Sequence, residues 1–208
     1  MPEQENFIIP RIPLDEAGLC AHALIVSASK SFEIKHTCQK DMHVHVKDPK
    51  WGTEHIEIIK MAKTILPESH ICAKEGWNIE ELSKLLDEGR VVIILDVTDM
   101  LSRYDKVLKK EVGKDEIDGH YVTLAGINSG MAVIVDPSAD EIVHEGKNGE
   151  YNFGVQLTDC ENIYLLPLSS LDKMWWDTEK NGRETNHWAL VLLHPDDDSM
   201  ILDKYRIK

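Results

Sequence analysis

The chain carries little positive charge and no long apolar run. Its 208 residues include 23 Lys and Arg against 37 Asp and Glu, which gives a formal net charge of −14. A protein that neutralises phosphates needs the opposite balance, so we expect no nucleic-acid partner and no affinity for an anionic membrane surface. No apolar run approaches the roughly 20 residues that cross a bilayer. The acidic start Met1–Asn6 is unlike a signal peptide, which predicts a cytoplasmic location.

The sequence also lacks paired cysteines. Four cysteines are present, with no CxxC pair and no regular spacing: Cys20, Cys38, Cys72 and Cys160. This pattern is typical of a reduced chain with free thiols and not of a disulfide scaffold. With 42% hydrophobic residues and five Trp, the chain can bury one sizeable core, and no segment resembles a flexible linker. We therefore expect a single domain over residues 1–208.

Several stretches have the composition of helices. Residues 19–32 contain neither Pro nor Gly and are rich in small side chains, which predicts a central helix packed closely on most sides. Thr53 can cap a second helix over residues 53–66. Asn78 with Glu81 resembles a capping box and predicts a third helix that ends at Gly89. Shorter helices are expected at residues 100–112 and 170–176.

Apolar runs between these helices predict strands, and the whole pattern is of the α+β class. Val91–Leu95 is the continuous apolar run that a buried strand needs. The tight turn Asn128–Gly130 lies between two apolar segments, which should pair as a hairpin. The remaining expected strands cover residues 71–73, 162–166, 188–193 and 200–202. The last two would pair around a turn at residues 196–199, and residues 138–152 read as a loop rich in Gly and charge.

The predicted hairpin brings a histidine close to a carboxylate. His120 stands at the start of the first strand and Asp136 at the end of the second, so antiparallel pairing returns Asp136 to the strand end that carries His120. A carboxylate there can accept the imidazole N–H and orient the ring towards a nucleophile. Cys20 would supply a thiol at the start of the central helix, where the helix dipole favours a thiolate. These residues predict a Cys–His–Asp site.

A rival pair has the same sequence separation. His187 begins and Asp203 closes the last expected strand pair, and periodicity does not choose between this pair and His120 with Asp136. Simpler interpretations also exist for the other two groups. A free cysteine such as Cys20 is often a small buried hydrophobe, and an Asp-Pro step such as Asp136-Pro is common in turns.

One segment contains several residues of the types that bind zinc: His36, Cys38, His43 and His45. On a strand, His43 and His45 would point to the same face. The spacing matches no standard zinc site, and His55, His70 or Cys72 would have to complete it. We therefore expect no metal and no cofactor, while a metal-binding protein that uses residues 36–45 stays as the third hypothesis.

Four segments stand in an informative order: Leu19-Cys-Ala-His-Ala-Leu-Ile25, Gly52-Thr-Glu-His-Ile-Glu57, Glu75–Leu95 (EGWNIEELSKLLDEGRVVIIL) and Gly119–Ile127 (GHYVTLAGI) followed by Val133–Pro137 (VIVDP). In this order they resemble the papain-like cysteine peptidase superfamily, and most closely the bacteriocin-processing peptidase domain and its stand-alone relatives. The similarity covers roughly residues 10–193.

This resemblance implies a papain-like α+β fold, with the N-terminal helix packed centrally on an antiparallel sheet. It implies catalytic roles for Cys20 as the nucleophile, His120 as the group that moves the proton and Asp136 as the group that holds the ring. It also selects this pair over His187 and Asp203. The expected activity is thiol-dependent hydrolysis or acyl transfer at an amide or thioester of a peptide or small acyl substrate. The choice between hydrolysis and transfer, the substrate and the oligomeric state stay open.

The chain departs from the family pattern beside the cysteine. The family carries a Gln six residues before the cysteine, and its amide stabilises the oxyanion, but this chain has Leu14 there. The Gly that usually follows the cysteine is Ala21. Loss of one oxyanion donor costs roughly 10²–10³ in rate. A catalytically inactive papain-like binding module is therefore the second hypothesis.

Overall fold

The computed structural model describes residues 20–34, 53–98, 119–137, 156–157, 163–178 and 182–206. In chain order its elements are α1 (Cys20–Ser31), α2 (His55–Ile65), β1 (His70–Lys74), α3 (Ile79–Glu88), β2 (Val91–Thr98), β3 (Gly119–Asn128), β4 (Met131–Val135), β5 (Gln156–Leu157), β6 (Ile163–Pro167), α6 (Leu168–Met174), β7 (Trp176–Thr178), β8 (Glu184–Asn186), β9 (Ala189–Leu193) and α7 (Met200–Asp203).

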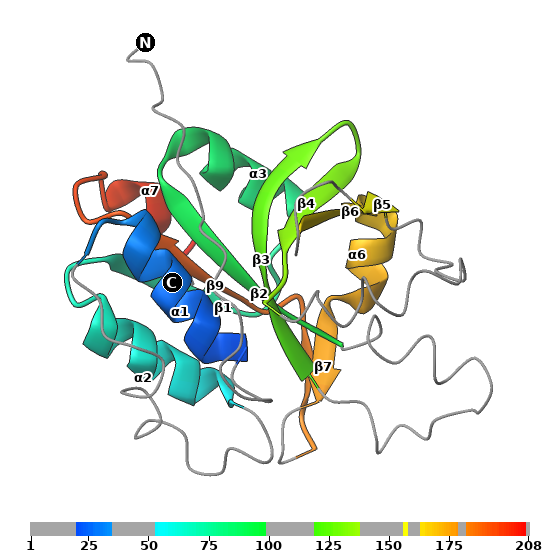
Figure 1. The fold of residues 1–208 in the computed structure, drawn as a ribbon, viewed down its shortest axis with the longest axis horizontal. Coiled ribbons are helices and arrows are strands. Elements are labelled where there is room, and N and C mark those ends of the chain that lie inside the picture. Colours follow the sequence, from blue (N-terminus) through cyan, green and yellow to red (C-terminus); the bar gives the residue numbers. More distant parts are fainter. Residues whose placement is uncertain are drawn as a thin grey trace.

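A seven-stranded sheet forms the centre of the fold, in the order β1-β9-β2-β3-β4-β6-β5 (Figure 1). Every neighbouring pair of strands in it is antiparallel. β9 lies between β1 and β2, and each of its residues is buried. A strand covered on both faces needs this continuous apolar sequence, which explains why β9 and most of β2 show no alternation. β7 and β8 pair separately.

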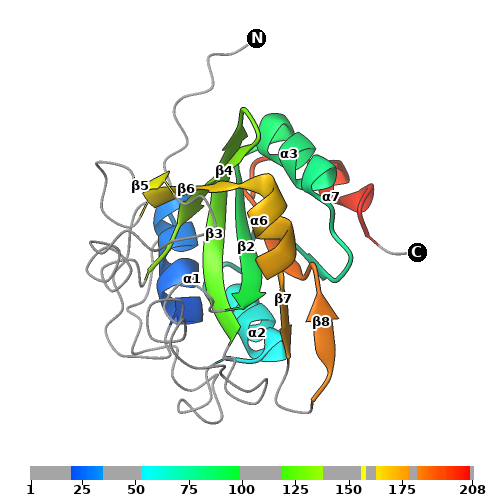
Figure 2. The same ribbon diagram turned by 90° about the vertical axis from the view of Figure 1, so that its right-hand side faces the viewer.

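Helices cover both faces of the sheet, so the α+β class and the N-terminal helix packed on an antiparallel sheet, both predicted from the sequence, are confirmed. Helices α1 and α2 pack on one face, against Val92, Ile94, Leu190 and Leu192. Figure 2 shows α1 on one side of the sheet and α3, α6 and α7 on the other. Helix α1 is buried from Cys20 through Ser29, as expected of a central helix that can approach its neighbours closely because its side chains are small.

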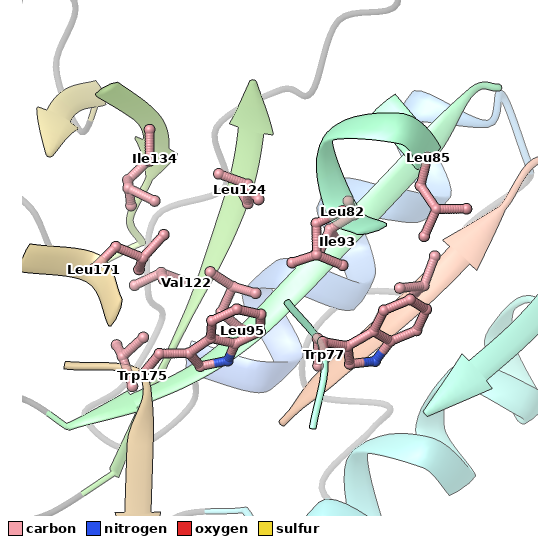
Figure 3. Close-up of a cluster of buried hydrophobic side chains, with 14 of the residues drawn as sticks. Trp77, Leu82, Leu85, Ile93, Leu95, Val122, Leu124, Ile134, Leu171 and Trp175 are labelled. Atoms are coloured by element: carbon pink, nitrogen blue, oxygen red, sulfur yellow. The ribbon is translucent and has the colours of Figure 1, made fainter. Parts of the chain in front are cut away.

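The second face holds two large aromatic side chains that fill the space under the helices. Trp77 precedes α3 and packs near Leu85, while Trp175 follows α6 and lies beside Leu95 and Val122 (Figure 3). Both indoles are completely buried. The indole Nε1 of Trp175 donates a hydrogen bond to the carbonyl of Trp188, at 2.7 Å.

The hairpin β3–β4 forms around the turn that the sequence predicts. Ser129 and Gly130 both have positive φ, 50° and 79°, the combination of a type I′ turn, whose twist matches that of paired strands. Asn128 pairs with Met131 directly across this turn. One irregularity in register lies between Leu124 and Gly126 of β3. The hairpin therefore fixes which residues of the two strands lie side by side.

Two local predictions were wrong. Glu54, not Thr53, is the N-cap of α2, because Glu57 stands three residues further on and its carboxylate accepts the N–H of Glu54 at 3.0 Å. Residues 200–203 form the short helix α7 and not a strand. β9 already pairs on both edges, with β1 and β2, so no edge is left for a further strand. The expected helix at 100–112 and the loop at 138–152 lie outside the described residues.

Candidate active site

Three neighbouring strands carry the polar side chains of the candidate site. His120 is the second residue of β3, Asp136 directly follows β4, and Tyr164 lies in β6. β4 lies between the other two strands, as Figure 1 shows. Val135 pairs with Thr123 of β3, so the chain end that carries Asp136 lies beside the start of β3. The fold thus aligns a histidine, a carboxylate and a phenol across the sheet.

The carboxylate of Asp136 accepts hydrogen bonds from both sides. The His120 Nε2 lies 2.9 Å from Asp136 Oδ1, and the hydroxyl of Tyr164 donates to Oδ2 at 3.2 Å. Asp136 is fully buried, whereas 13% of the His120 side chain is exposed. Because an ionised carboxylate is only an acceptor, it fixes a proton on Nε2 and leaves Nδ1 as the nitrogen that can exchange a proton.

The thiol of Cys20 is the fourth side chain of the candidate site. Cys20 is the first residue of α1, and its side chain lies near enough to the imidazole of His120 to help raise the pKa of that ring. Since Nε2 faces Asp136, Nδ1 is the imidazole nitrogen available to the sulfur. The structure therefore brings together Cys20, His120 and Asp136, the three residues that the sequence predicts for the site. Their catalytic roles stay predictions.

The surroundings of His120 favour its charged form. Burial of the ring lowers its pKa, but the charge and hydrogen bond of Asp136, with the contact to Cys20, outweigh burial. The pKa of His120 is raised well above 6.5 as a result. An imidazolium beside a thiol stabilises the thiolate, which is the nucleophilic form of cysteine. The arrangement can thus hold a nucleophile and a proton donor side by side.

The rival residues His187 and Asp203 do not meet. His187 Nε2 lies 3.3 Å from Asp172 Oδ1, and its ring stacks on Trp175 with the ring centroids 4.7 Å apart. Asp203 forms an ion pair with Arg206 at 3.0 Å within the C-terminal turn. Since residues 200–203 are helical, no strand returns Asp203 to His187.

The possible zinc ligands of the third hypothesis lie outside the described residues, as do Leu14 and Cys160: His36, Cys38, His43 and His45. Within the part of the chain that the structure describes, no group of three or more His, Cys, Asp or Glu residues could hold a metal ion. Two residues considered as completing ligands have other surroundings. His55 bonds to Asp96, and Cys72 belongs to the apolar cluster under α3.

Two contacts near the site were not predicted. Sequence reasoning treated Tyr164 only as part of the strand expected over residues 162–166, and it did not consider Asp96. A signal was present for each: a Tyr at an inward strand position needs a partner for its hydroxyl, and so does an Asp that continues an apolar strand. Neither signal identifies the partner, because His55 and Asp136 come from other segments.

The chain is similar to known proteins in its fold, although its sequence matches no family model and no curated protein. Solved structures do match. A protein described as a C39-like peptidase from Bacillus anthracis has a TM-score of 0.56 at 15% identity, over 89% of this chain and 94% of that one. The chain has the fold of the C39-like peptidase domains. The peptidase domain of Streptococcus ComA, from a bifunctional ABC transporter of a quorum-sensing pathway, gives 0.54 at 14%, over 89% and 98%.

A third structure with the C39-like fold is a double glycine motif protease from an AMS/PCAT transporter, solved in complex with the leader peptide. It matches with a TM-score of 0.53 at 16% identity, over 90% of this chain and 93% of the other. The resemblance that the four sequence segments indicate is thus confirmed at the level of the fold. Among the described residues, none of the helices has the length and apolar character needed to span a bilayer.

Proposed function

We propose that the chain is a thiol-dependent enzyme that cleaves or transfers an acyl group at an amide or thioester bond. The observation that carries the proposal is the placement of His120 between Cys20, which helps raise the pKa of the imidazole, and the carboxylate of Asp136, 2.9 Å from His120 Nε2. A nucleophile, a base and a group that orients the base are the three parts that covalent acyl transfer needs. The C39-like fold supports the same reading.

The reaction follows from these contacts. The Cys20 thiolate attacks the carbonyl carbon of the substrate, and the C=O electron pair moves onto oxygen. As the tetrahedral intermediate collapses, the imidazolium of His120 gives its proton to the leaving amine or thiol, which departs and leaves an acyl-cysteine. Water or another acceptor then loses a proton to His120 and attacks the acyl carbon, and the thiolate leaves. Asp136 holds the ring throughout and stabilises its charge.

The oxyanion needs a donor that Leu14 cannot supply. The backbone N–H groups in the first turn of a helix have no partner within the helix, and they point towards its N-terminus. Cys20 opens α1, so its own N–H is the donor we propose for the oxyanion. A backbone donor at this place needs no glutamine side chain.

A peptide is the substrate class that we propose. One solved protein with this fold is a protease in complex with a leader peptide. The net charge of −14 favours a neutral or basic peptide over an acidic one, because like charges repel during the encounter. A peptide also requires no cofactor for its cleavage by a thiol.

The test is hydrolysis of activated esters and of a peptide pool by wild type, Cys20→Ala and Cys72→Ala. Cys72 is a matched control, since it is buried in the cluster on the other face of the sheet. We expect Cys20→Ala to abolish turnover and Cys72→Ala to retain it. Turnover that persists undiminished in Cys20→Ala would refute every mechanism that uses this thiol.

The second candidate function is a binding module without turnover, and Leu14 in the place of the oxyanion Gln favours it. In that case wild type would hydrolyse neither substrate class, yet peptides would still bind. Titration of Cys20→Ala with the peptide pool should show binding under either function. The fate of the peptide with wild type then separates the two, because an enzyme consumes the bound peptide and a binding module does not.

A further inference from the structure

We propose that Tyr164 is a positioning residue of this site, which holds Asp136 so that its carboxylate keeps His120 in its charged, oriented form. The proposal rests on the function proposed above, and it adds Tyr164 to Cys20, His120 and Asp136 as a residue of the candidate site. Tyr164 lies in β6, on the opposite side of β4 from β3. Tyr164 takes no part in bond making, because its hydroxyl donates to the carboxylate that acts through the imidazole.

The geometry places a donor at each of the two carboxylate oxygens of Asp136. His120 from β3 donates to Oδ1 at 2.9 Å, and Tyr164 from β6 donates to Oδ2 at 3.2 Å. Tyr164 pairs across the strands with Ile134, two residues before Asp136, so both side chains belong to the same face of the sheet. Donors arriving from both neighbouring strands clamp the carboxylate between them.

This clamp matters because the Asp side chain has a soft terminal torsion. The rotation of a carboxylate about its last bond is broad, so a single hydrogen bond leaves its plane poorly defined. Asp136 is fully buried and Tyr164 is 2% exposed, so water cannot replace a lost donor easily. With the hydroxyl of Tyr164 in place, Oδ1 stays directed at Nε2 of His120.

A phenol also suits this role electrostatically. The charge of Asp136 is the leading cause that raises the pKa of His120 against the opposing effect of burial. A Lys or Arg in place of Tyr164 would neutralise that charge and weaken its hold on the imidazolium. The neutral O–H of a tyrosine orients the carboxylate and leaves its charge available to His120. The choice of residue type at position 164 therefore fits a positioning role.

The decisive variant is Tyr164→Phe, with Tyr121→Phe as the matched control. Tyr121 is equally buried and also loses one hydrogen bond, from its hydroxyl to the carbonyl of Thr53 at 2.9 Å. The first measurement is the NMR titration of the His120 ring, with the pH profile of Cys20 alkylation by iodoacetamide. In Tyr164→Phe we expect the His120 midpoint and the alkaline limb of alkylation to move to lower pH, and in Tyr121→Phe to stay as in wild type.

Turnover gives the second measurement. We expect Tyr164→Phe to lower kcat about 10-fold with KM unchanged, since a bond to a charged group is lost while substrate contacts remain. An unchanged His120 titration in Tyr164→Phe, or an equal shift in Tyr121→Phe, would overturn the positioning role. The titration needs no substrate, so a chain without turnover whose His120 midpoint still shifts only in Tyr164→Phe would refute the proposed function and support the positioning role.

A further measurement covers the case in which Tyr164→Phe does not fold. The ring carbon of Tyr164 that bears the hydroxyl can be observed by ¹³C NMR in wild type and in Asp136→Asn. We expect this resonance to shift when Asp136 loses its charge, whereas the corresponding resonance of Tyr205 should not. An unchanged Tyr164 resonance in a folded Asp136→Asn protein would refute the contact in solution.

Discussion

His55 and Asp96 form a buried hydrogen-bonded pair between the start of helix α2 and strand β2. The ring Nε2 lies 2.5 Å from Asp96 Oδ2, and the side chains are 9% and 2% exposed. The imidazole stacks face to face on Trp188, with the centroids 3.9 Å apart and the planes at 2°. Asp96 pairs across the strands with Tyr121, the residue after His120. The pair therefore braces the part of β3 that carries the candidate base.

Removal of the His55 side chain should lower the free energy of unfolding substantially. His55→Ala leaves the Asp96 carboxylate buried without this partner, and breaking a buried pair in this way typically costs about 3–5 kcal/mol. Urea unfolding monitored by tryptophan fluorescence measures the loss. The control is Glu88→Ala, which breaks the exposed pair between Glu88 and Lys204 and should cost less than about 1 kcal/mol. Equal losses in the two variants would show that the pair does not stabilise the fold.

The pair of His120 and Asp136 should make stability depend on pH. The pKa of His120 in the folded chain is raised above the ordinary value of 6.5, so the folded state binds the proton more tightly than the unfolded one. The resulting stabilisation is fully present below pH 6.5 and is lost as the pH rises through the folded-state pKa.

Urea unfolding from pH 6.5 upward tests this dependence, in a Cys20→Ala background so that the thiol does not contribute. We expect the free energy of unfolding of Cys20→Ala to fall as the pH rises. In the double variant Cys20→Ala, Asp136→Asn it should fall much less, because the Asp136 carboxylate is the main cause that raises the pKa of His120. Parallel curves for the two proteins would show that Asp136 does not hold a charged His120.

Cys20 should be the most reactive of the four thiols near neutral pH. It contacts the imidazole of His120, whereas burial raises the pKa of the Cys72 thiol and keeps it protonated. Iodoacetamide labelling followed by peptide mapping gives the order of reactivity. His120→Ala should slow the labelling of Cys20, and His187→Ala should not. Faster labelling of another cysteine in the folded protein would make the nucleophile assignment wrong.

Leu14→Gln tests how the oxyanion is stabilised. If a backbone donor such as the N–H of Cys20 already stabilises the oxyanion, Leu14→Gln should change the rate of ester and amide hydrolysis little. If the chain is a weakened enzyme, the new amide should raise the rate by up to roughly 100-fold, the lower end of what one such donor contributes. A large increase would therefore contradict the substitute donor proposed here. Measurement of kcat on activated esters, with Cys20→Ala as the blank, gives the answer.

Local chemistry made much of the fold predictable. The capping box predicted at the start of α3 is present: Asn78 and Glu81, only three residues apart, exchange hydrogen bonds of 2.9 and 3.2 Å. The turn at Ser129 and Gly130 likewise depends on residues adjacent in the chain. The strand expected over residues 200–202 was wrong, because whether a short apolar segment pairs depends on a free sheet edge, which is a property of the whole sheet.

The sequence by itself determined the elements and the candidate residues. The order Cys20, His120, Asp136 and the hairpin between the last two follow from nearby residues and from the motif resemblance. Only the tertiary structure decided which polar groups meet. His187 lies against Asp172 and not Asp203, Tyr164 reaches Asp136, and His55 reaches Asp96. Such contacts join segments far apart in the chain, and their partners are fixed by strand order and register, which emerge only when the sheet is assembled.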